Sequence, residues 1–312
     1  MTSRVPLSRE LTDRMMRLPR AGRIHQEALR ALALAETCTD DSDGRRPVLT
    51  RVLWEGGEEI TRITGTDTYR LISAQTARTR DCVKPRNGEA WELEGYAIGK
   101  ATRTKAVRGA EKPEVRIERD GDSAKLVSDG YSEAWEALPV FSGDKPLPYP
   151  DWHKVVPQDE AIAWSVRLRL DHLHKALHGL VRTFEATRQG TACVYFMPGE
   201  EGLEIQPCVD LVEAGGWPVR HHGCLVQGHT EVEKIEVVPV NAQYLRQVLP
   251  RWMEFEGSEA EVMIGIRQFA YPLWLATERV DMLLMPMTGA GNYAVMQCKL
   301  HKIGEDWGRA EL

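Results

Sequence analysis

The chemistry that this sequence offers most clearly is the binding of apolar side chains, near the end of the chain. Residues 280–287 read as a buried strand that stops at Pro286, because proline has no N–H to donate to a sheet ladder. Met285 and Met287 flank that proline. Unbranched, polarizable methionine side chains at a strand end can repack around different apolar guests. The segment is therefore a candidate surface for docking a peptide, with an ordinary last core strand as the alternative.

Catalytic and metal-binding chemistry has weaker support. Asp67, Asp151 and Asp210 are isolated acids whose ordinary role is in turns or caps. The densest group of metal-binding residue types is residues 221–224, His-His-Gly-Cys, followed by His229, and its spacing matches no strong zinc pattern. We therefore expect no catalytic residue, no metal and no cofactor, and a protein that is not an enzyme.

Length and composition describe an ordinary soluble, globular chain. Its 312 residues suffice for two or three domains of roughly 100–200 residues each, with 42% hydrophobic and 28% charged residues. We find neither the run of about 20 apolar residues that a membrane span needs nor a signal peptide, and so expect a cytoplasmic protein. Six cysteines without a C-x-x-C pair indicate reduced thiols. The net charge of −6 still allows a basic stripe, because the distribution of charge decides contact with nucleic acid.

The elements that would position these residues fall into two halves joined by a proline-rich connector. In the first half we expect helices at residues 25–36 and 88–102, with a shorter helix before them, and strands at 48–54, 60–65, 72–74, 115–119, 124–128 and 132–138. The connector, residues 141–157, should be extended and well defined. In the second half we expect helices at 171–186 and 241–249, the latter ended by Pro250, and strands at 161–167, 193–197, 203–208, 262–266, 273–276 and 280–284.

The second half repeats the order of the first at a nearly constant distance. Val115 and Val262 correspond at an offset of 147 (262 − 115), and Pro139 and Pro286 share that offset. A sustained offset predicts a duplicated module, each copy with two helices and a set of antiparallel strands. The alternative is a chance match of alternating apolar residues.

Basic side chains recur on the exposed side of each expected helix. In the helix at 171–186, leucines at helical spacing form one face, and Lys175, His178 and Arg182 lie on the other. For a single helix, a solvated surface would explain such cations equally well. Because they recur in both halves while the acidic residues lie mostly elsewhere, we interpret them as one shared basic face.

Three stretches, in this order, resemble the bacterial DNA polymerase III beta subunit, the sliding clamp. They are residues 64–71 (TGTDTYRL), 147–157 (LPYPDWHKVVP) and 283–287 (LLMPM). That family carries A-T-D-G-H-R-L in its middle domain, leaves it through P-D-Y-x-x-V-x-P, and ends in V-M-P-M-R. Residues 240–245 (VNAQYL) also resemble the start of the last domain's second helix. The resemblance covers about residues 25–288.

The departures from the family are equally specific. Only counterparts of the middle and last of its three domains are visible. Thr68 and Tyr69 replace the family's Gly-His, and Lys154 stands where an arginine is usual. The chain also continues beyond Met287 to Leu312, where the family normally ends almost at once.

The resemblance implies an α+β fold with two copies of the processivity fold, sheets outside and two helices per domain lining a ring. We expect an unmatched extension at residues 1–24, a clamp domain at 25–157 resembling the middle one, a clamp domain at 158–288 resembling the last one, and an unmatched tail at 289–312. Because the family's ring holds six such domains, a two-domain chain would close it as a homotrimer. The implied partners are duplex DNA bound without sequence preference, DNA polymerase, other proteins with clamp-binding motifs, and a clamp loader.

The resemblance also assigns residues to two surfaces. The groove for partner peptides would be built by Thr66, Thr68, Tyr69, Arg70, Leu71, Pro150, Lys154, Val155, Leu283, Met285, Pro286 and Met287. The DNA-facing residues would be Arg17, Arg20, Arg23, Arg30, Lys100, Arg103, Lys105, Arg108, Lys175, His178, Arg182, Arg246 and Arg251. A second hypothesis keeps the fold and the groove but not the ring, as a paralogue that captures clamp-binding peptides as a regulator or decoy.

Overall fold

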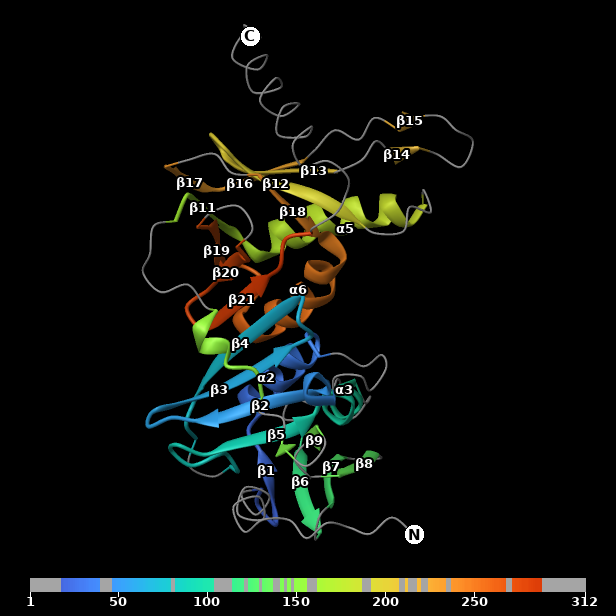
Figure 1. Ribbon diagram of the computed structural model, residues 1–312, viewed down its shortest axis with the longest axis vertical. Helices are drawn as coiled ribbons and strands as arrows, with labels where there is room; N and C mark the ends of the chain where they lie inside the picture. Colours follow the sequence, from blue (N-terminus) through green and yellow to red (C-terminus); the bar gives the residue numbers. More distant parts are fainter. Residues whose placement is uncertain are drawn as a thin grey trace, which may run out of the picture.

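The computed structural model shows two units of similar construction, stacked along the long axis of the molecule (Figure 1). It describes residues 18–39, 47–79, 82–103, 114–120, 123–128, 131–136, 141–142, 145–146, 149–155, 162–186, 192–207, 211–212, 218–219, 224–233, 237–267 and 271–287. We call the elements from β1 to β8 the first unit and those from β11 to β21 the second unit. Within the described residues, no helix is long and apolar enough to cross a membrane.

The first unit contains two antiparallel sheets of four strands. One has the order β1 (Ala21–Ile24), β6 (Val115–Asp120), β7 (Ser123–Ser128), β8 (Tyr131–Glu136). The other has the order β4 (Arg70–Ala77), β3 (Ile60–Thr66), β2 (Arg51–Gly56), β5 (Ala90–Glu94). Its helices are α2 (Gln26–Glu36) and α3 (Gly95–Arg103), and the short helix η1 (Pro47–Thr50) leads into β2. The connector adds β9 (Phe141–Ser142), β10 (Lys145–Pro146) and the short helix η2 (Trp152–Lys154).

The second unit repeats this plan. One row of strands is β11 (Trp164–Arg169), β19 (Glu261–Ile266), β20 (Leu273–Ala276), β21 (Val280–Leu284), with β17 (His229–Val232) added beside β11. The other is β16 (Cys224–Gln227), β13 (Gly202–Pro207), β12 (Cys193–Gly199), β18 (Val238–Asn241). Its helices are α5 (Leu170–Ala186) and α6 (Ala242–Glu256), and β14 (Leu211–Val212) pairs with β15 (Pro218–Val219).

Comparing the two strand orders confirms the duplicated α+β architecture. In the order in which the strands lie in the sheets, β1, β6, β7 and β8 correspond to β11, β19, β20 and β21. In the same way, β4, β3, β2 and β5 correspond to β16, β13, β12 and β18. The offset of 147 that links Val115 to Val262 also links Gly95 to Ala242, the first residues of α3 and α6. The repeat at an offset of 147 residues in the sequence therefore reflects the same elements occurring in both units.

The two units share one continuous sheet. β21 of the second unit pairs antiparallel with β4 of the first, in a register that places Leu283 opposite Leu71. The result is a sheet of nine strands in the order β17-β11-β19-β20-β21-β4-β3-β2-β5. We call the contact between β4 and β21 the joint. Figure 1 shows it halfway along the molecule, where the red strand β21 meets the blue strand β4.

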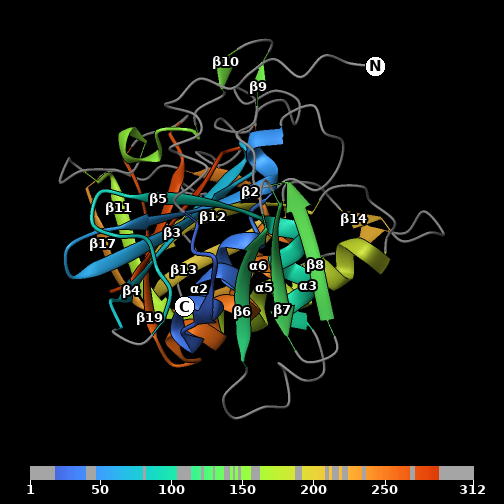
Figure 2. The same cartoon turned by 90° about the horizontal axis from the view of Figure 1, so that it is seen from below.

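The helices form a row beneath the sheets, with α5 against α6, α6 against α2, and α2 against α3. We call this row the helix layer; Figure 2 shows its end at α3, beside β7 and β8. Helix α2 is apolar nearly all round because it lies inside the row and also under β3 and β4. Gly65 permits that close packing, since a Cβ there would lie 2.0 Å from the carbonyl oxygen of Ala35. One apolar core runs through both units, with Trp54, Trp164 and Trp252 almost fully buried in it.

Three expectations about local structure were wrong. Pro250 does not end its helix, because burial of Val248, Leu249, Trp252 and Phe255 along α6 outweighs the roughly 3 kcal/mol that an internal proline costs. In the segment 88–102, the first part is strand β5 and the helix begins only at Gly95. A strand, β1, pairs with β6 inside the segment expected to be an unmatched extension, so this sheet begins at Ala21.

Candidate functional site

A cavity of about 550 Å³ opens beside the joint and is lined by residues of both units. Its walls come from the β3–β4 turn and η1 of the first unit, from the connector around η2, and from β20, β21 and the segments that flank them. The lining residues are Leu49, Thr66, Thr68, Arg70, Leu71, Pro150, Asp151, Trp152, Lys154, Val155, Arg267, Tyr271, Pro272, Leu283 and Met285. Several of these, including Met285, Val155 and Tyr271, are large apolar side chains that remain exposed.

The β3–β4 turn is fixed by its own side chains. The Asp67 carboxylate accepts the main-chain N–H groups of Tyr69 (3.0 Å) and Arg70 (2.9 Å) through the same oxygen, Oδ1. The Thr66 hydroxyl donates to the carbonyl oxygen of Arg70 (2.9 Å) and accepts the N–H of Thr68 (3.3 Å). Short polar side chains that bond nearby main-chain groups are typical of turns. The sequence T-D-T-Y-R thus holds one shape at the cavity wall.

The opposite wall is tied to this turn. The N–H of Met285 donates to the carbonyl oxygen of Tyr69 (2.8 Å), just beyond the last paired residues of β21 and β4. Pro286, which follows, could not have made such a bond. The end of β21 and the β3–β4 turn therefore keep a fixed distance across the cavity.

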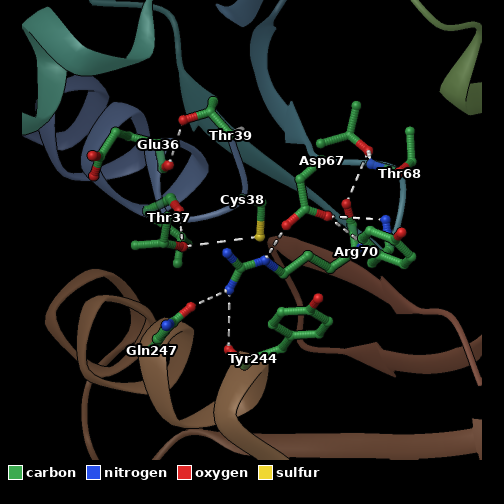
Figure 3. Close-up of polar contacts among 12 residues, drawn as sticks. Glu36, Thr37, Cys38, Thr39, Asp67, Thr68, Arg70, Tyr244 and Gln247 are labelled. Carbon is green, nitrogen blue, oxygen red and sulfur yellow. Dashed lines mark hydrogen bonds and ion pairs between the residues drawn. The ribbon is translucent and has the colours of Figure 1, made fainter. Parts of the chain in front are cut away.

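Arg70 is one of the cavity-lining residues, and its guanidinium extends into the joint toward Tyr244 and Gln247 of α6 (Figure 3). Nε donates to Asp67 Oδ2 (2.7 Å), Nη1 donates to Gln247 Oε1 of α6 (2.8 Å), and the guanidinium lies 4.7 Å from the centre of the Tyr244 ring. The side chain is only 8% exposed. Burial alone would lower the pKa of Arg70, but the nearby Cys38 and Asp67 raise it, so the group stays charged. Arg70 therefore joins the two units.

The connector is anchored to the first unit through two aromatic residues. The Trp152 indole N–H donates to Glu55 Oε2 (3.0 Å), and the Tyr149 hydroxyl donates to the carbonyl oxygen of Thr64 (3.1 Å). Burial raises the pKa of Tyr149, so its hydroxyl remains a donor. Trp152 packs in a small apolar cluster with Leu71 and Leu283, which belong to different units. The cavity floor is consequently a packed part of the joint, and a ligand would meet a preformed surface.

The structure brings together nine of the twelve residues expected in the groove. Three do not line the cavity. Tyr69 is exposed and stacks on Tyr244 at 6.3 Å between ring centres. Met287 packs with Cys193 and Tyr195 of β12 and donates its N–H to Pro239, and Pro286 lies half-buried between the two methionines. The two methionines of the M-P-M motif therefore lie apart: Met285 lines the cavity and Met287 packs in the second unit.

Six lining residues were missed by the sequence analysis. Asp151 and Trp152 stood inside the connector motif, and Leu49 lay within an expected strand, so a local signal existed for these three. Arg267, Tyr271 and Pro272 come from the segment between β19 and β20, where the sequence carries no periodicity. Arg267 lies over the Tyr271 ring at 5.3 Å. Only the fold brings that segment to the cavity.

The residues expected to face DNA divide into three groups. On the helix layer, the structure exposes Arg30, Lys100, Arg103, Lys175, His178 and Arg182 and leaves Arg246 and Arg251 half-buried. Arg20 precedes β1 and Arg23 lies in it; because Ile24 next to it faces the core, Arg23 points to the other side of the sheet, away from the helices. Arg17, Lys105 and Arg108 lie outside the described residues.

Acidic residues accompany the basic ones on the four helices. The four helices carry seven lysines and arginines (Arg30, Lys100, Arg103, Lys175, Arg182, Arg246 and Arg251) and six acids (Glu27, Glu36, Asp171, Glu185, Glu254 and Glu256), a difference of one charge. Four pairs are in contact: Arg246–Glu185 (2.6 Å), Arg251–Glu254 (2.5 Å), Arg103–Glu36 (2.8 Å) and Lys175–Asp171 (3.5 Å). Glu27 and Glu256 also pair with Arg279, which lies outside the helices, so the helix layer keeps a small excess of basic side chains, four of which are paired within the layer.

The remaining polar candidates have structural roles. Asp67 holds the turn and Arg70, and Asp151 pairs with Lys154 at 2.9 Å. Asp210 and residues 221–223 lie outside the described residues, and His229 is exposed near Glu231. In the part of the chain that the structure describes, no three His, Cys, Asp or Glu side chains lie close enough to hold a metal ion.

The fold is that of the sliding clamps. The structure is similar to the DNA polymerase III beta subunit of Thermotoga maritima (TM-score 0.61, 16% identity, 87% of this chain and 66% of that one). It is also similar to the DNA polymerase sliding clamp of Bacillus subtilis (TM-score 0.62, 17% identity, 87% and 66%) and to the Helicobacter pylori beta clamp bound to a DNA ligase peptide (TM-score 0.59, 14% identity, 92% and 68%).

This chain spans about two thirds of the length of those clamps. No protein-family model and no curated protein matches it. At such low identity the likeness establishes the architecture, two clamp-type units joined through one sheet.

Proposed function

We propose that this protein is a DNA sliding clamp of two-domain chains, in which three copies close around duplex DNA and the cavity at the joint tethers polymerases and other partners. It acts as a scaffold without a chemical step, in the cytoplasm and with a clamp loader to place it on DNA. The observation that carries the proposal is the cavity. It combines exposed apolar side chains with walls fixed by partly buried hydrogen bonds, in the fold of a clamp that was solved with a DNA ligase peptide.

The cavity suits a short extended peptide with aliphatic and aromatic side chains. Leu49, Leu71, Trp152, Leu283 and Met285 supply the apolar lining, and 550 Å³ is within the range of ligand-sized pockets, roughly 300–1,000 Å³. A peptide of the Q-L-x-L-F type, the kind that the resemblance implies, would place two or three anchors there. Such anchors usually dominate the binding energy.

Titration calorimetry with that peptide tests the tethering role. Met285→Asp places a charge on the cavity wall and should weaken binding about thirtyfold or more, since losing one anchor contact often costs about 2 kcal/mol. Met287→Asp is not a matched control, because Met287 packs in the second unit. Val232→Asp is suitable, because Val232 is similarly exposed but lies on β17, outside the cavity. Equal affinity of wild type and Met285→Asp, or no binding by the wild type, would overturn this role.

The free sheet edges support the ring. Within the chain, β21 pairs with β4. Their counterparts in the duplication, β8 in the first unit and β16 in the second, end their sheets among the described strands. A second copy could pair its β16 with β8 and repeat the joint from chain to chain. This contact is head-to-tail, so it continues until the rotation closes a ring, which six units would do in three copies.

Exposed apolar residues occur at both of these edges. Tyr96 of α3 is 50% exposed and Leu225 of β16 is 47% exposed. In the joint, α6 packs against α2, and their counterparts at the free ends are α3 and α5. Pairing β8 with β16 would therefore cover both side chains.

Light scattering at micromolar concentration should show three times the chain mass. Leu225→Arg should convert the trimer to smaller species, while Val232→Arg, at equal exposure on β17, should leave it intact. A wild-type protein that is strictly monomeric or dimeric at all accessible concentrations would remove the three-copy ring.

The charge balance of the helix layer favours a second candidate function. A paralogue that captures clamp-binding peptides as a regulator or decoy needs the cavity but no attraction for phosphate. Four of the seven basic side chains in the four helices are paired with acids of the same layer, which suits that role better than a strongly basic layer would. Peptide binding by a monomer without measurable DNA affinity would identify this alternative.

A further inference from the structure

Thr68 is held in a conformation that threonine normally avoids. Its φ is +76°, and among the described residues it is the one non-glycine residue with a positive φ. A β-branched side chain in the left-handed region is a genuine outlier, and such residues cost on the order of 1–3 kcal/mol. Glycine would occupy the same conformation without that cost.

The hydrogen bonds of the turn impose this conformation. The Thr66 hydroxyl accepts the N–H of Thr68, the Asp67 carboxylate accepts the two N–H groups that follow Thr68, and the carbonyl oxygen of Tyr69 accepts the N–H of Met285. The backbone on either side of Thr68 cannot change its conformation without breaking these hydrogen bonds. The strain is therefore retained by the surrounding structure, as is typical of strained residues at functional sites.

The strained side chain lies at the cavity. Thr68 is exposed and is part of the same lining as Leu71, Leu283 and Met285. With a positive φ, a threonine at this position adds a methyl group and a hydroxyl group to a wall that a glycine would leave open. A side chain that costs stability and faces the ligand space is best explained by a contact with the ligand.

We propose that Thr68 is a specificity-determining residue, whose side chain touches the bound peptide and selects which peptides the cavity accepts. The inference rests on the proposed peptide-binding function. The occupant is an extended segment of a partner protein with aliphatic or aromatic anchors. Thr68 narrows the wall beside one anchor, so that it favours a side chain that fits against the threonine methyl and disfavours a larger one.

The test combines unfolding and peptide binding on three variants. Thr68→Gly should raise the unfolding midpoint, because the strain is removed, and should weaken the Q-L-x-L-F-type peptide at least fivefold. Thr68→Asn, which tolerates a positive φ, should also be more stable but should bind with altered peptide preference. Gly88→Thr is the matched control: Gly88 has a φ of +77° and nothing within 4 Å of an added Cβ, and it lies outside the cavity. That variant should be less stable and should bind as wild type does.

A peptide series with each position changed to alanine locates the contact. In a double-mutant cycle with Thr68→Gly, one peptide position should show coupling of at least threefold in affinity, and the others should be additive. If wild type and Thr68→Gly bind every peptide of the series with equal affinity, the proposed role of Thr68 is overturned while the proposed peptide-binding function of the cavity is retained. If wild type binds no peptide of the series, the proposed function fails and the role of Thr68 fails with it.

Discussion

At the joint beside the cavity, Asp67 and Arg70 are largely buried and bonded to the main chain or across the joint, whereas along the helix layer most basic side chains are exposed and four of them pair with acids. Asp67 and Arg70 are 11% and 8% exposed at their side chains, and Trp152 is fixed through Glu55. Arg103 of the helix layer is 57% exposed although it contacts Glu36. The first kind of contact fixes a shape, because a buried polar group that loses its partner costs about 1–3 kcal/mol.

Exposed ion pairs behave differently. They contribute about 0–1 kcal/mol each, are screened by salt, and let the side chains exchange partners at little cost. Cations on the helix layer can therefore leave their acids for a phosphate group, which suits contact with a moving DNA better than a fixed fit does. The cavity is therefore preformed for one ligand shape, whereas the helix layer can adapt its contacts but attracts phosphate groups only weakly.

The largest expected effect comes from Arg279, which connects the helices α2 and α6 to the joint. Its guanidinium pairs with Glu27 of α2, donates to Glu256 of α6 (3.1 Å), and lies 4.5 Å from the centre of the Phe255 ring. Its carbonyl oxygen accepts the N–H of Gln75 in β4 (2.8 Å). Arg279→Ala would leave two carboxylates near each other, one of them, Glu256, only 8% exposed. Because the side chains of Arg279 and Glu27 are 34% and 28% exposed, we expect the free energy of unfolding to fall by about 2 kcal/mol, less than the roughly 3–5 kcal/mol of a fully buried pair.

Urea denaturation measures this change, and the shape of the transition is informative. The two units should begin to unfold separately, since the joint is weakened, and peptide affinity should fall because the cavity spans the joint. Arg279→Lys should recover part of the lost stability, because lysine keeps the positive charge but lacks the planar guanidinium group that can bond two carboxylates. Arg78→Ala is a control, because Arg78 bonds only main-chain oxygens of Gly57 and Glu58 within the first unit. If Arg279→Ala and Arg78→Ala lowered the free energy of unfolding equally, the contacts of Arg279 at the joint would contribute no more to stability than those of Arg78 within the first unit.

Alkaline pH should destabilise the protein at the joint, through the buried thiol of Cys38. Cys38 follows α2 beside Arg70 and Asp67 (Figure 3), and burial raises the pKa of its thiol to about 12. The folded state thus favours the neutral thiol more than the unfolded chain does. This stability is fully present below the unfolded pKa of about 8.5–9 and is lost as the pH rises toward 12. One pH unit above the unfolded value, the loss reaches about 1.4 kcal/mol.

The comparison of wild type with Cys38→Ala isolates this term. The alanine variant should be less stable at pH 7, because it loses a buried side chain, and the difference between the two proteins should shrink by about 1.4 kcal/mol near pH 10. Tyrosine ionisation affects both proteins and cancels in the difference. A difference that stays constant between pH 7 and pH 10 would mean that the thiol is not held in the core.

Sequence reasoning was most successful where the signal is local. The turn T-D-T-Y-R and the connector are short motifs whose own side chains shape them, so their resemblance to the clamp motifs could assign Thr66, Leu71 and Pro150 to one groove. The strands were found because alternating apolar residues report burial directly. The duplication was visible because both units need the same pattern of apolar residues.

The failures arose where distant segments decide the outcome. Trp252 and Phe255 continue the helical spacing of apolar residues beyond Pro250, but whether this face outweighs the cost of the proline depends on its packing against α2 and α5. Met287 and Met285 look equivalent in the chain, but the bond from Met287 to Pro239 turns one of them into the second unit. The pairing of Arg103 with Glu36 joins α3 to α2, so charge balance on the helix layer could not be read from single helices.

The smallest effect on stability, and the sharpest test between the two candidate functions, concerns the charges of the helix layer. Glu36→Gln and Glu185→Gln together release Arg103 and Arg246 from their acids. Because both pairs are open to solvent, the free energy of unfolding should change by less than about 1 kcal/mol. Binding to linear duplex DNA should strengthen, and the slope of log affinity against log salt should steepen by up to about 0.9 for each additional phosphate that the protein neutralises.

Charge reversal at Lys175 and Arg182 should have the opposite effect and flatten that slope. Glu201→Gln with Glu231→Gln removes two exposed acids outside the four helices and changes the net charge equally. If this control strengthens DNA binding as much as the helix variant does, only the overall charge matters. If none of the variants changes affinity or slope, the helix layer is a solvated surface. The cavity would then be the functional part of the molecule, which is what a peptide-capturing decoy requires and what a sliding clamp, needing both regions, could not tolerate.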